Sequence, residues 1–371
     1  MASSYKTFLP CVLLMFSAFS WAQQEPSRYP QQFEGDWTVP DFTFQSGEKL
    51  AQLRLHYITL GSPEHDGSGH VRNAVLMLHG TGGTSRSFLA AELGGELFGS
   101  GQPLDASRYY IILPDAIGTG GSSKPSDGLR LKFPHFRYGD MVRAQYLLVH
   151  DGLKVDHLRL VLGASQGGMH SWLWGETYPD FMDALMPMAS APVEIAGRNR
   201  MTRTMAIQAI KNDPDWKNGE YKTEPRGLIA ARAIRSIMTG SPLEFQKQNP
   251  TAQKADAAVE ALAKTALQLD ANDTIYQYES SYDYDPSPLL EKIQAPLFAV
   301  NSADDEINPP ELGILEREIK RVKRGRYILI PLSGETRGHQ TYNRAVLWKN
   351  YLLELLDVSK PSGGAVFGGT R

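Results

Sequence analysis

The apolar positions of the chain fall into short runs separated by stretches long enough to form helices. Residues 42–44 and 53–57 alternate apolar and polar side chains around the turn Ser46-Gly47-Glu48, which predicts an antiparallel hairpin. Continuous apolar runs follow at 75–78, 110–113, 158–162, 184–188, 297–300 and 327–330. Strands of this kind need cover on both faces, so the alternation predicts an α/β fold with a mostly parallel, doubly wound sheet.

One long interval carries no strand-like run. Between residues 191 and 290 the chain shows helical spacing instead, most clearly at Ala255, Ala258, Val259, Leu262, Ala263 and Ala266. The interval predicts a helical cap at 191–290, inserted between two parts of an α/β core at 23–190 and 291–358. Near the end of the cap, four tyrosines either pack on the surface or form a pocket wall, namely Tyr276, Tyr278, Tyr282 and Tyr284.

The N-terminus predicts a signal peptide at 1–22. Lys6 is the only charged side chain before the mostly apolar stretch 8–19, and Ser20-Trp21-Ala22 is a small-x-small cleavage pattern. A membrane-spanning helix would need about 20 apolar residues. We therefore expect a secreted or periplasmic protein with no stable membrane anchor after cleavage. The glycine-rich tail 359–371 lacks periodicity and is expected to be disordered.

Charge and cysteine content exclude several classes of function. The 38 basic and 41 acidic residues give a net charge of -3 without blocks of one sign, which argues against a nucleic-acid partner. The sole cysteine, Cys11, lies in the predicted signal peptide, so the processed chain would have no disulfide, thiolate nucleophile or cysteine metal site. We expect a small-molecule substrate and no cofactor or metal, and leave a homodimer open.

The strongest chemical signal follows the apolar run at 158–162. Gly163-Ala164-Ser165-Gln166-Gly167 is a Gly-x-Ser-x-Gly motif, and a helical pattern continues from it to residue 178. A buried strand before this motif and a helix after it are the context of a nucleophile elbow, in which a sharp turn exposes the serine hydroxyl. Ser165 is therefore the predicted nucleophile.

A serine nucleophile needs a histidine base and a carboxylate that orients the base, in the chain order Ser, acid, His. His339 is the only histidine beyond Ser165 and the helix that follows it. Candidate acids follow the run at 297–300, in Asp304-Asp305-Glu306. An acid followed four residues later by proline selects Asp305, with Asp304 as the alternative.

Two backbone N–H groups are expected to stabilise the oxyanion that forms when the serine attacks a carbonyl. One belongs to Gln166, directly after the nucleophile. The other is assigned to Thr81, in the glycine-rich segment His79-Gly80-Thr81-Gly82-Gly83 after the run at 75–78. A phosphate-binding loop is the alternative interpretation of this segment, but the Gly-Lys-Ser/Thr ending of such loops is absent.

Together these segments resemble the α/β-hydrolase superfamily and, within it, the homoserine O-acetyltransferase-like family. Similar stretches also occur at 137–145, 208–219, 227–232 and 270–285. The resemblance implies an α/β-hydrolase fold with Asp305 and His339 as acid and base. It also implies a reaction in which acetyl passes from acetyl-CoA to the serine and then to the hydroxyl of homoserine.

Two departures from the family remove charges suited to an amino acid. Ile207 stands where the family has an arginine, and Gln340 stands where it has an acid after the base. We therefore predict an exported serine hydrolase that acts on an ester-type acyl substrate through a Ser-Asp-His acyl-enzyme mechanism. The alternatives are an O-acyltransferase that moves an acyl group to a small alcohol and a non-catalytic binding protein on the same fold.

Overall fold

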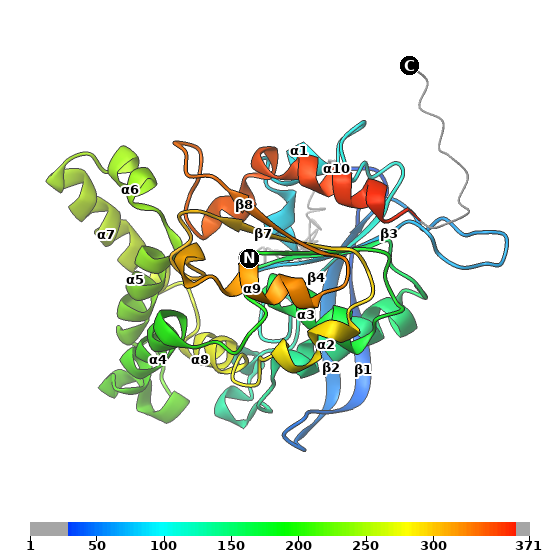
Figure 1. The fold of residues 1–371 in the computed structure, drawn as a ribbon. Helices are drawn as coiled ribbons and strands as arrows, with labels where there is room; N and C mark the ends of the chain where they lie inside the picture. Colours follow the sequence, from blue (N-terminus) through cyan, green and yellow to red (C-terminus); the bar gives the residue numbers. More distant parts are fainter. Residues whose placement is uncertain (1–28, 361–371) are drawn as a thin grey trace, which may run out of the picture.

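The computed structural model describes residues 29–360, which form a central sheet with helices on both faces and a group of helices at one end (Figure 1). The predicted signal peptide lies outside the described residues, as does the predicted tail after Lys360. The sheet has eight strands in the order β1-β2-β4-β3-β5-β6-β7-β8. Their bounds are Phe33–Thr43, Lys49–Leu60, Ala74–Leu78, Tyr110–Pro114, Leu160–Ala164, Leu185–Met188, Leu297–Ser302 and Gly325–Ile330 for β1 to β8.

The strand pairing confirms the predicted fold class. β1 and β2 form an antiparallel hairpin, β2 pairs antiparallel with β4, and every later pair from β4 to β8 is parallel. The six predicted apolar runs each agree with a strand to within two residues. The hairpin strands are longer than predicted, because polar side chains on their exposed face interrupt the apolar pattern while backbone pairing continues.

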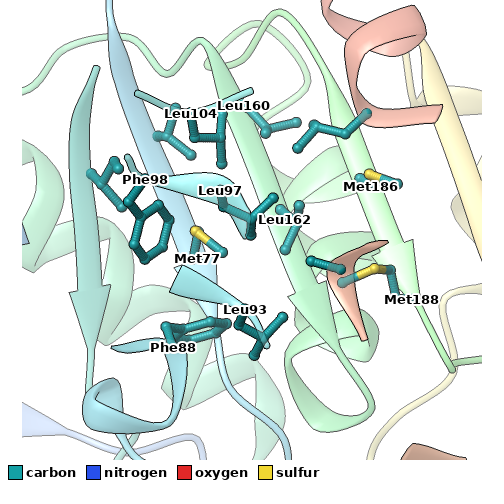
Figure 2. Packing of buried hydrophobic residues seen from close by; sticks show 14 of the residues in the cluster. Met77, Phe88, Leu93, Leu97, Phe98, Leu104, Leu160, Leu162, Met186 and Met188 are labelled. Atoms are coloured by element: carbon teal, nitrogen blue, oxygen red, sulfur yellow. The ribbon is translucent and has the colours of Figure 1, made fainter. Parts of the chain in front are cut away.

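Alternation along the parallel strands divides the core between the two faces of the sheet. Val75 and Met77 of β3 face a cluster that includes Leu97 and Trp348, close to α1 and α10. Leu76 belongs to the opposite cluster, with side chains from α2 and α3. Figure 2 shows the first cluster, where residues of β3, β5 and β6 meet the segment around α1. Burial on both faces explains why these strands read as continuous apolar runs.

The helices separate into those that cover the sheet and those that follow β6. Between β6 and β7, residues 191–290 carry no strand, and α4 to α8 lie together at one end of the sheet (Figure 1). Within the described residues, no helix is long and apolar enough to span a membrane. The bounds of α1 to α10 are Gly94–Leu97, Tyr138–Leu147, Gln166–Thr177, Gly197–Lys211, Gly227–Thr239, Pro242–Gln248, Ala252–Ala266, Ala271–Glu279, Ile314–Glu318 and Lys349–Val358.

The four tyrosines near the end of this insertion do not share one role. Tyr276 packs against Phe133 in the core beneath the hairpin, and Tyr284 joins the same cluster. Tyr278 belongs to the core of the inserted helices themselves. Only Tyr282 is exposed, at 41 %. Surface packing is therefore wrong for three of the four, because tertiary contacts bury their rings.

Asp273 joins the inserted helices to the α/β core. Its carboxylate accepts hydrogen bonds from the backbone N–H and the hydroxyl of Ser126, at 2.9 and 2.6 Å. Burial, together with the nearby charge of Asp270, raises the pKa of Asp273 to about 6. The folded protein therefore holds a proton on Asp273 more tightly than the unfolded chain does.

This shift predicts a loss of stability at neutral pH. The contribution of Asp273 is fully present below its unfolded pKa of 3.8 and is lost as the pH rises through about 6. Between pH 4 and pH 8, the free energy of unfolding of D273N should rise by about 1–3 kcal/mol relative to that of the parent. Denaturant titrations at both pH values measure this difference, and an unchanged difference would contradict the expectation.

Candidate active site

The predicted nucleophile lies at the carboxyl edge of the parallel strands. Ser165 follows β5 directly and has φ of 55° and ψ of −114°, a conformation that a non-glycine residue adopts only under strain. The flanking glycines permit it. A Cβ on Gly163 would lie 2.1 Å from the carbonyl oxygen of Gly167, and a Cβ on Gly167 would lie 1.9 Å from that of Leu78. The motif therefore provides the close packing that a sharp strand-to-helix turn requires.

Three side chains from distant parts of the chain meet at this turn. The Nε2 of His339 lies 2.8 Å from the Oγ of Ser165. The Nδ1 of the same ring lies 2.9 and 3.0 Å from the two carboxylate oxygens of Asp305. All three residues are nearly inaccessible to solvent. The structure thus brings together the three residues predicted as nucleophile, base and acid, at hydrogen-bond distance.

The surroundings of Asp305 keep it ionised. Burial by itself would raise the pKa of this carboxyl, but the adjacent His339 and the backbone N–H groups of Ile307 and Asn308 outweigh it and lower the pKa below its ordinary value. The amide of Asn308 also links the acid loop to the carbonyl of Ala189, at 2.9 Å. An ionised Asp305 can accept the Nδ1–H of His339, which leaves Nε2 free to accept a proton.

Asp304, the alternative acid, holds the histidine loop instead of the histidine ring. Its carboxylate accepts a hydrogen bond from the backbone N–H of Gly338 at 2.9 Å and another from the hydroxyl of Ser302. Within the part of the chain that the structure describes, it forms no hydrogen bond or ion pair with His339. Asp305 therefore contacts the ring of His339, whereas Asp304 contacts the backbone of its loop. The sequence left open which of the two aspartates lies at the ring.

The glycine-rich loop after β3 approaches Ser165, the predicted nucleophile, closely. A Cβ on Gly80 would lie 3.4 Å from the Cβ of Ser165, at van der Waals contact, so the loop passes directly beside this serine. His79 fixes the loop, because its Nδ1 donates to the carbonyl of Gly80 at 2.8 Å and its Nε2 accepts from the N–H of Ala116 at 3.0 Å. Burial lowers the pKa of His79, in keeping with the neutral ring that this pairing requires.

Both predicted oxyanion donors are free of other partners. Between residues 29 and 360, neither the backbone N–H of Thr81 nor that of Gln166 donates a hydrogen bond. Gln166 is also the first residue of α3, where an N–H group has no partner within the helix and carries part of the positive end of the helix dipole. Two unpaired N–H groups beside Ser165 can therefore donate hydrogen bonds to an oxyanion.

The remaining candidates near the site have structural partners. His170, five residues after the nucleophile, receives a hydrogen bond on Nδ1 from the amide of Gln145 at 3.0 Å, and burial lowers its pKa to about 3. Asp115 accepts the backbone N–H groups of Ser85 and Gly121. Among the described residues, no group of three or more His, Cys, Asp or Glu side chains could hold a metal ion.

The two departures from the family have different surroundings. Ile207 packs in the core of the inserted helices, beside Ile210 and Leu228. The Oε1 of Gln340 accepts a hydrogen bond from Asn343 at 2.7 Å. Sequence reasoning missed Arg203, which lies one helical turn before Ile207 and is 2 % exposed. Its position four residues before Ile207, on the same side of the helix, was the available signal.

The sequence of the chain is similar to the alpha/beta hydrolase family and to several proteins named as acyltransferases. The model of the alpha/beta hydrolase fold matches residues 73–335, more than half of the chain. A homoserine O-acetyltransferase of Solidesulfovibrio magneticus is 32% identical over 285 residues, which cover 72% of this chain and 68% of that protein. A probable acyltransferase of Methanothermobacter thermautotrophicus is 28% identical over 282 residues, which cover 75% and 84%.

Solved structures agree on the fold. The acetyl esterase MekB superposes with a TM-score of 0.75 at 23% identity, covering 87% of this chain and 96% of the esterase. A similarity at this level of identity shows that the two proteins share a fold, and the chemistry has to be inferred from the residues of the site. The sheet topology, the strained serine after β5 and the matched family model agree, and the chain belongs to the alpha/beta hydrolase family, with homoserine O-acetyltransferases among its relatives.

Proposed function

We propose that this protein is a serine hydrolase that cleaves an ester-type acyl substrate through an acyl-enzyme. The observation that carries the proposal is the continuous chain of hydrogen bonds from Ser165 through His339 to Asp305. It is supported by the two unpaired N–H groups beside the serine, at Thr81 and Gln166. Together these groups supply what acyl transfer requires, namely an activated nucleophile, a proton carrier and an oxyanion site.

The steps follow from these roles. The Oγ of Ser165 bonds to the acyl carbon while its proton passes to Nε2 of His339, and Asp305 stabilises the resulting imidazolium. The N–H groups of Thr81 and Gln166 hold the oxyanion. When the bond to the leaving oxygen breaks, His339 returns the proton to the leaving alcohol. Water then attacks the acyl-serine, giving its proton to His339, and release of the acid returns that proton to Ser165.

Water is the proposed acceptor, and a small alcohol is the alternative. The named relatives include transferases, whereas the structural neighbour MekB is an esterase, so both outcomes occur on this fold. Gln340 lacks the negative charge that would pair with the ammonium of homoserine, and Ile207 offers no charge where the family has an arginine. A hydrogen bond to a charged group is worth about 1.5–3 kcal/mol, so homoserine should compete poorly with water.

Acceptor choice is tested by supplying an activated aryl ester with and without millimolar homoserine. We expect free acid as the main product in both cases, with little O-acyl-homoserine, as measured by mass spectrometry of the products. Dominant O-acyl-homoserine would overturn the hydrolase proposal in favour of the transferase. A fluorophosphonate probe should label Ser165, and failure to label would favour the non-catalytic binding protein.

Export is a further part of the proposal. It is supported by the pattern of the first 22 residues, with Lys6 before the apolar stretch and a small residue at Ala22. Protein made from the full sequence in a bacterial host should begin at Gln23 and lie outside the cytoplasm, as measured by N-terminal sequencing of cell fractions. The variant L13R/L14R, which interrupts the apolar stretch, should remain inside. An intact N-terminus in the cytosol of the parent would contradict export.

A further inference from the structure

A buried arginine near the candidate site has no carboxylate partner. Arg203 of α4 is 2 % exposed, and its Nε donates to the side-chain oxygen of Asn199 at 3.1 Å. One terminal nitrogen reaches the hydroxyl of Ser281 at 3.3 Å. Between residues 29 and 360, no Asp or Glu forms an ion pair with this guanidinium. A buried charge is costly unless it is paired, and a guanidinium offers five N–H donors.

Arg203 lies beside side chains that lead to the oxyanion loop. The hydroxyl of Tyr138 is buried and has no hydrogen bond of normal geometry, and the same is true of the hydroxyl of Thr81. Burial raises the pKa of Tyr138, while the neighbouring Arg203 and Thr81 lower it, which places all three side chains close together. Thr81 belongs to the loop that approaches Ser165. The guanidinium of Arg203 therefore lies in the same part of the molecule as the proposed nucleophile.

A second arginine reaches the same region from α5. Arg235 is half-buried, forms no ion pair with a described carboxylate and lies 5.9 Å from the ring of Tyr278. Its charge acts on Tyr138 and also on Tyr342. The ring of Tyr342 packs edge-on against His339, with centroids 5.9 Å apart. Both arginines therefore lie near Tyr138, and Arg235 also lies near Tyr342, which packs against His339.

The two arginines also act on each other. The charge of Arg235 adds to burial in lowering the pKa of Arg203. Two like charges that share a poorly solvated region repel each other unless an anion lies between them. Packing alone does not explain this arrangement, because apolar side chains would fill the same space without the cost of desolvating a charge.

We propose that Arg203 and Arg235 form an anion subsite beside Ser165, and that the substrate is an ester carrying a carboxylate. The proposal rests on the proposed hydrolase function and adds the chemical class of its substrate. A guanidinium binds a carboxylate through two parallel hydrogen bonds, and the unpaired hydroxyl of Tyr138 can donate a third. The carboxylate belongs either to the acyl part of the ester or to its alcohol part.

Two pairs of probes separate these sources. 4-Nitrophenyl hemisuccinate carries the carboxylate in the acyl part, and its methyl succinate analogue is neutral. 4-Acetoxybenzoate carries it in the alcohol part, with its methyl ester as the neutral analogue. We expect kcat/KM for one of the two carboxylate probes to exceed that of its neutral analogue by about tenfold or more, since a single charged hydrogen bond can supply such a factor.

Variants assign this preference to the two arginines. R203Q and R235Q should each remove about tenfold of the preference for the carboxylate probe over its neutral analogue. R203K should retain part of it because it keeps the charge. The matched control R232Q replaces an exposed arginine of α5 and should change nothing. Thermal unfolding of each variant checks the fold, and R235Q keeps the test open if the buried R203Q fails to fold.

The outcomes distinguish the inference from the function on which it rests. Hydrolysis of neutral probes with no preference for either carboxylate probe would overturn the anion subsite alone. An equal loss of preference in R232Q would also overturn it. Absence of hydrolysis on all four probes, with no fluorophosphonate labelling of Ser165, would overturn the proposed hydrolase together with the subsite.

Discussion

Replacing Ser165 by alanine is expected to lower the rate of ester hydrolysis by about 10⁴-fold or more while the protein stays folded. The substitution removes only the oxygen that lies 2.8 Å from Nε2 of His339. The backbone turn is held by Gly163 and Gly167, which remain. Single-turnover and steady-state rates on an activated aryl ester measure the loss, and thermal unfolding measures whether the fold is kept.

His339 should behave in the same way, because nucleophile and base act as one unit. H339A is expected to lose about as much activity as S165A, and the double variant little more than either. The matched control is H170Q, which replaces a buried histidine of the adjoining helix that does not contact Ser165. A retained rate in S165A or H339A would refute the assignment of nucleophile and base.

Changing each of the two neighbouring aspartates to asparagine should lower turnover by clearly different amounts. D305N is expected to lower turnover by about 10²–10⁴-fold, because an amide in place of the ionised carboxylate leaves the ring of His339 in the wrong tautomer. D304N should cost far less. Its side-chain oxygen can still accept the backbone N–H of Gly338, now held by Asp304 at 2.9 Å.

The measurement is the pH dependence of kcat/KM for both variants on one activated ester. A base that has lost its carboxylate should show an altered pKa in the rate profile, whereas a loop that has merely shifted should not. Equal losses in the two variants would show that the contact of His339 with Asp305 carries no special weight. A larger loss in D304N would transfer the role of acid to Asp304.

The sequence alone determined the fold class and the position of the elbow that carries the predicted nucleophile. Continuous apolar runs marked β3 to β8 because a strand covered on both faces must be apolar at every position. The elbow at Ser165 was recognisable because its requirements are local, namely a strand, two small residues and a helix within a short stretch. His339 was identified by elimination, since no other histidine follows the helix after Ser165.

Tertiary structure alone decided which side chains meet across the chain. The sequence offered Asp304 and Asp305 as neighbours, and only the packing of β7 beside β8 brings one to the histidine ring and the other to its loop. Because Ile207 stands where the family has an arginine, the sequence suggested that the site had lost a positive charge. Yet Arg203, one turn away, is buried against Tyr138, which lies 65 residues earlier in the chain. Periodicity reports which face of an element is buried, whereas the partners on that face depend on contacts between distant segments.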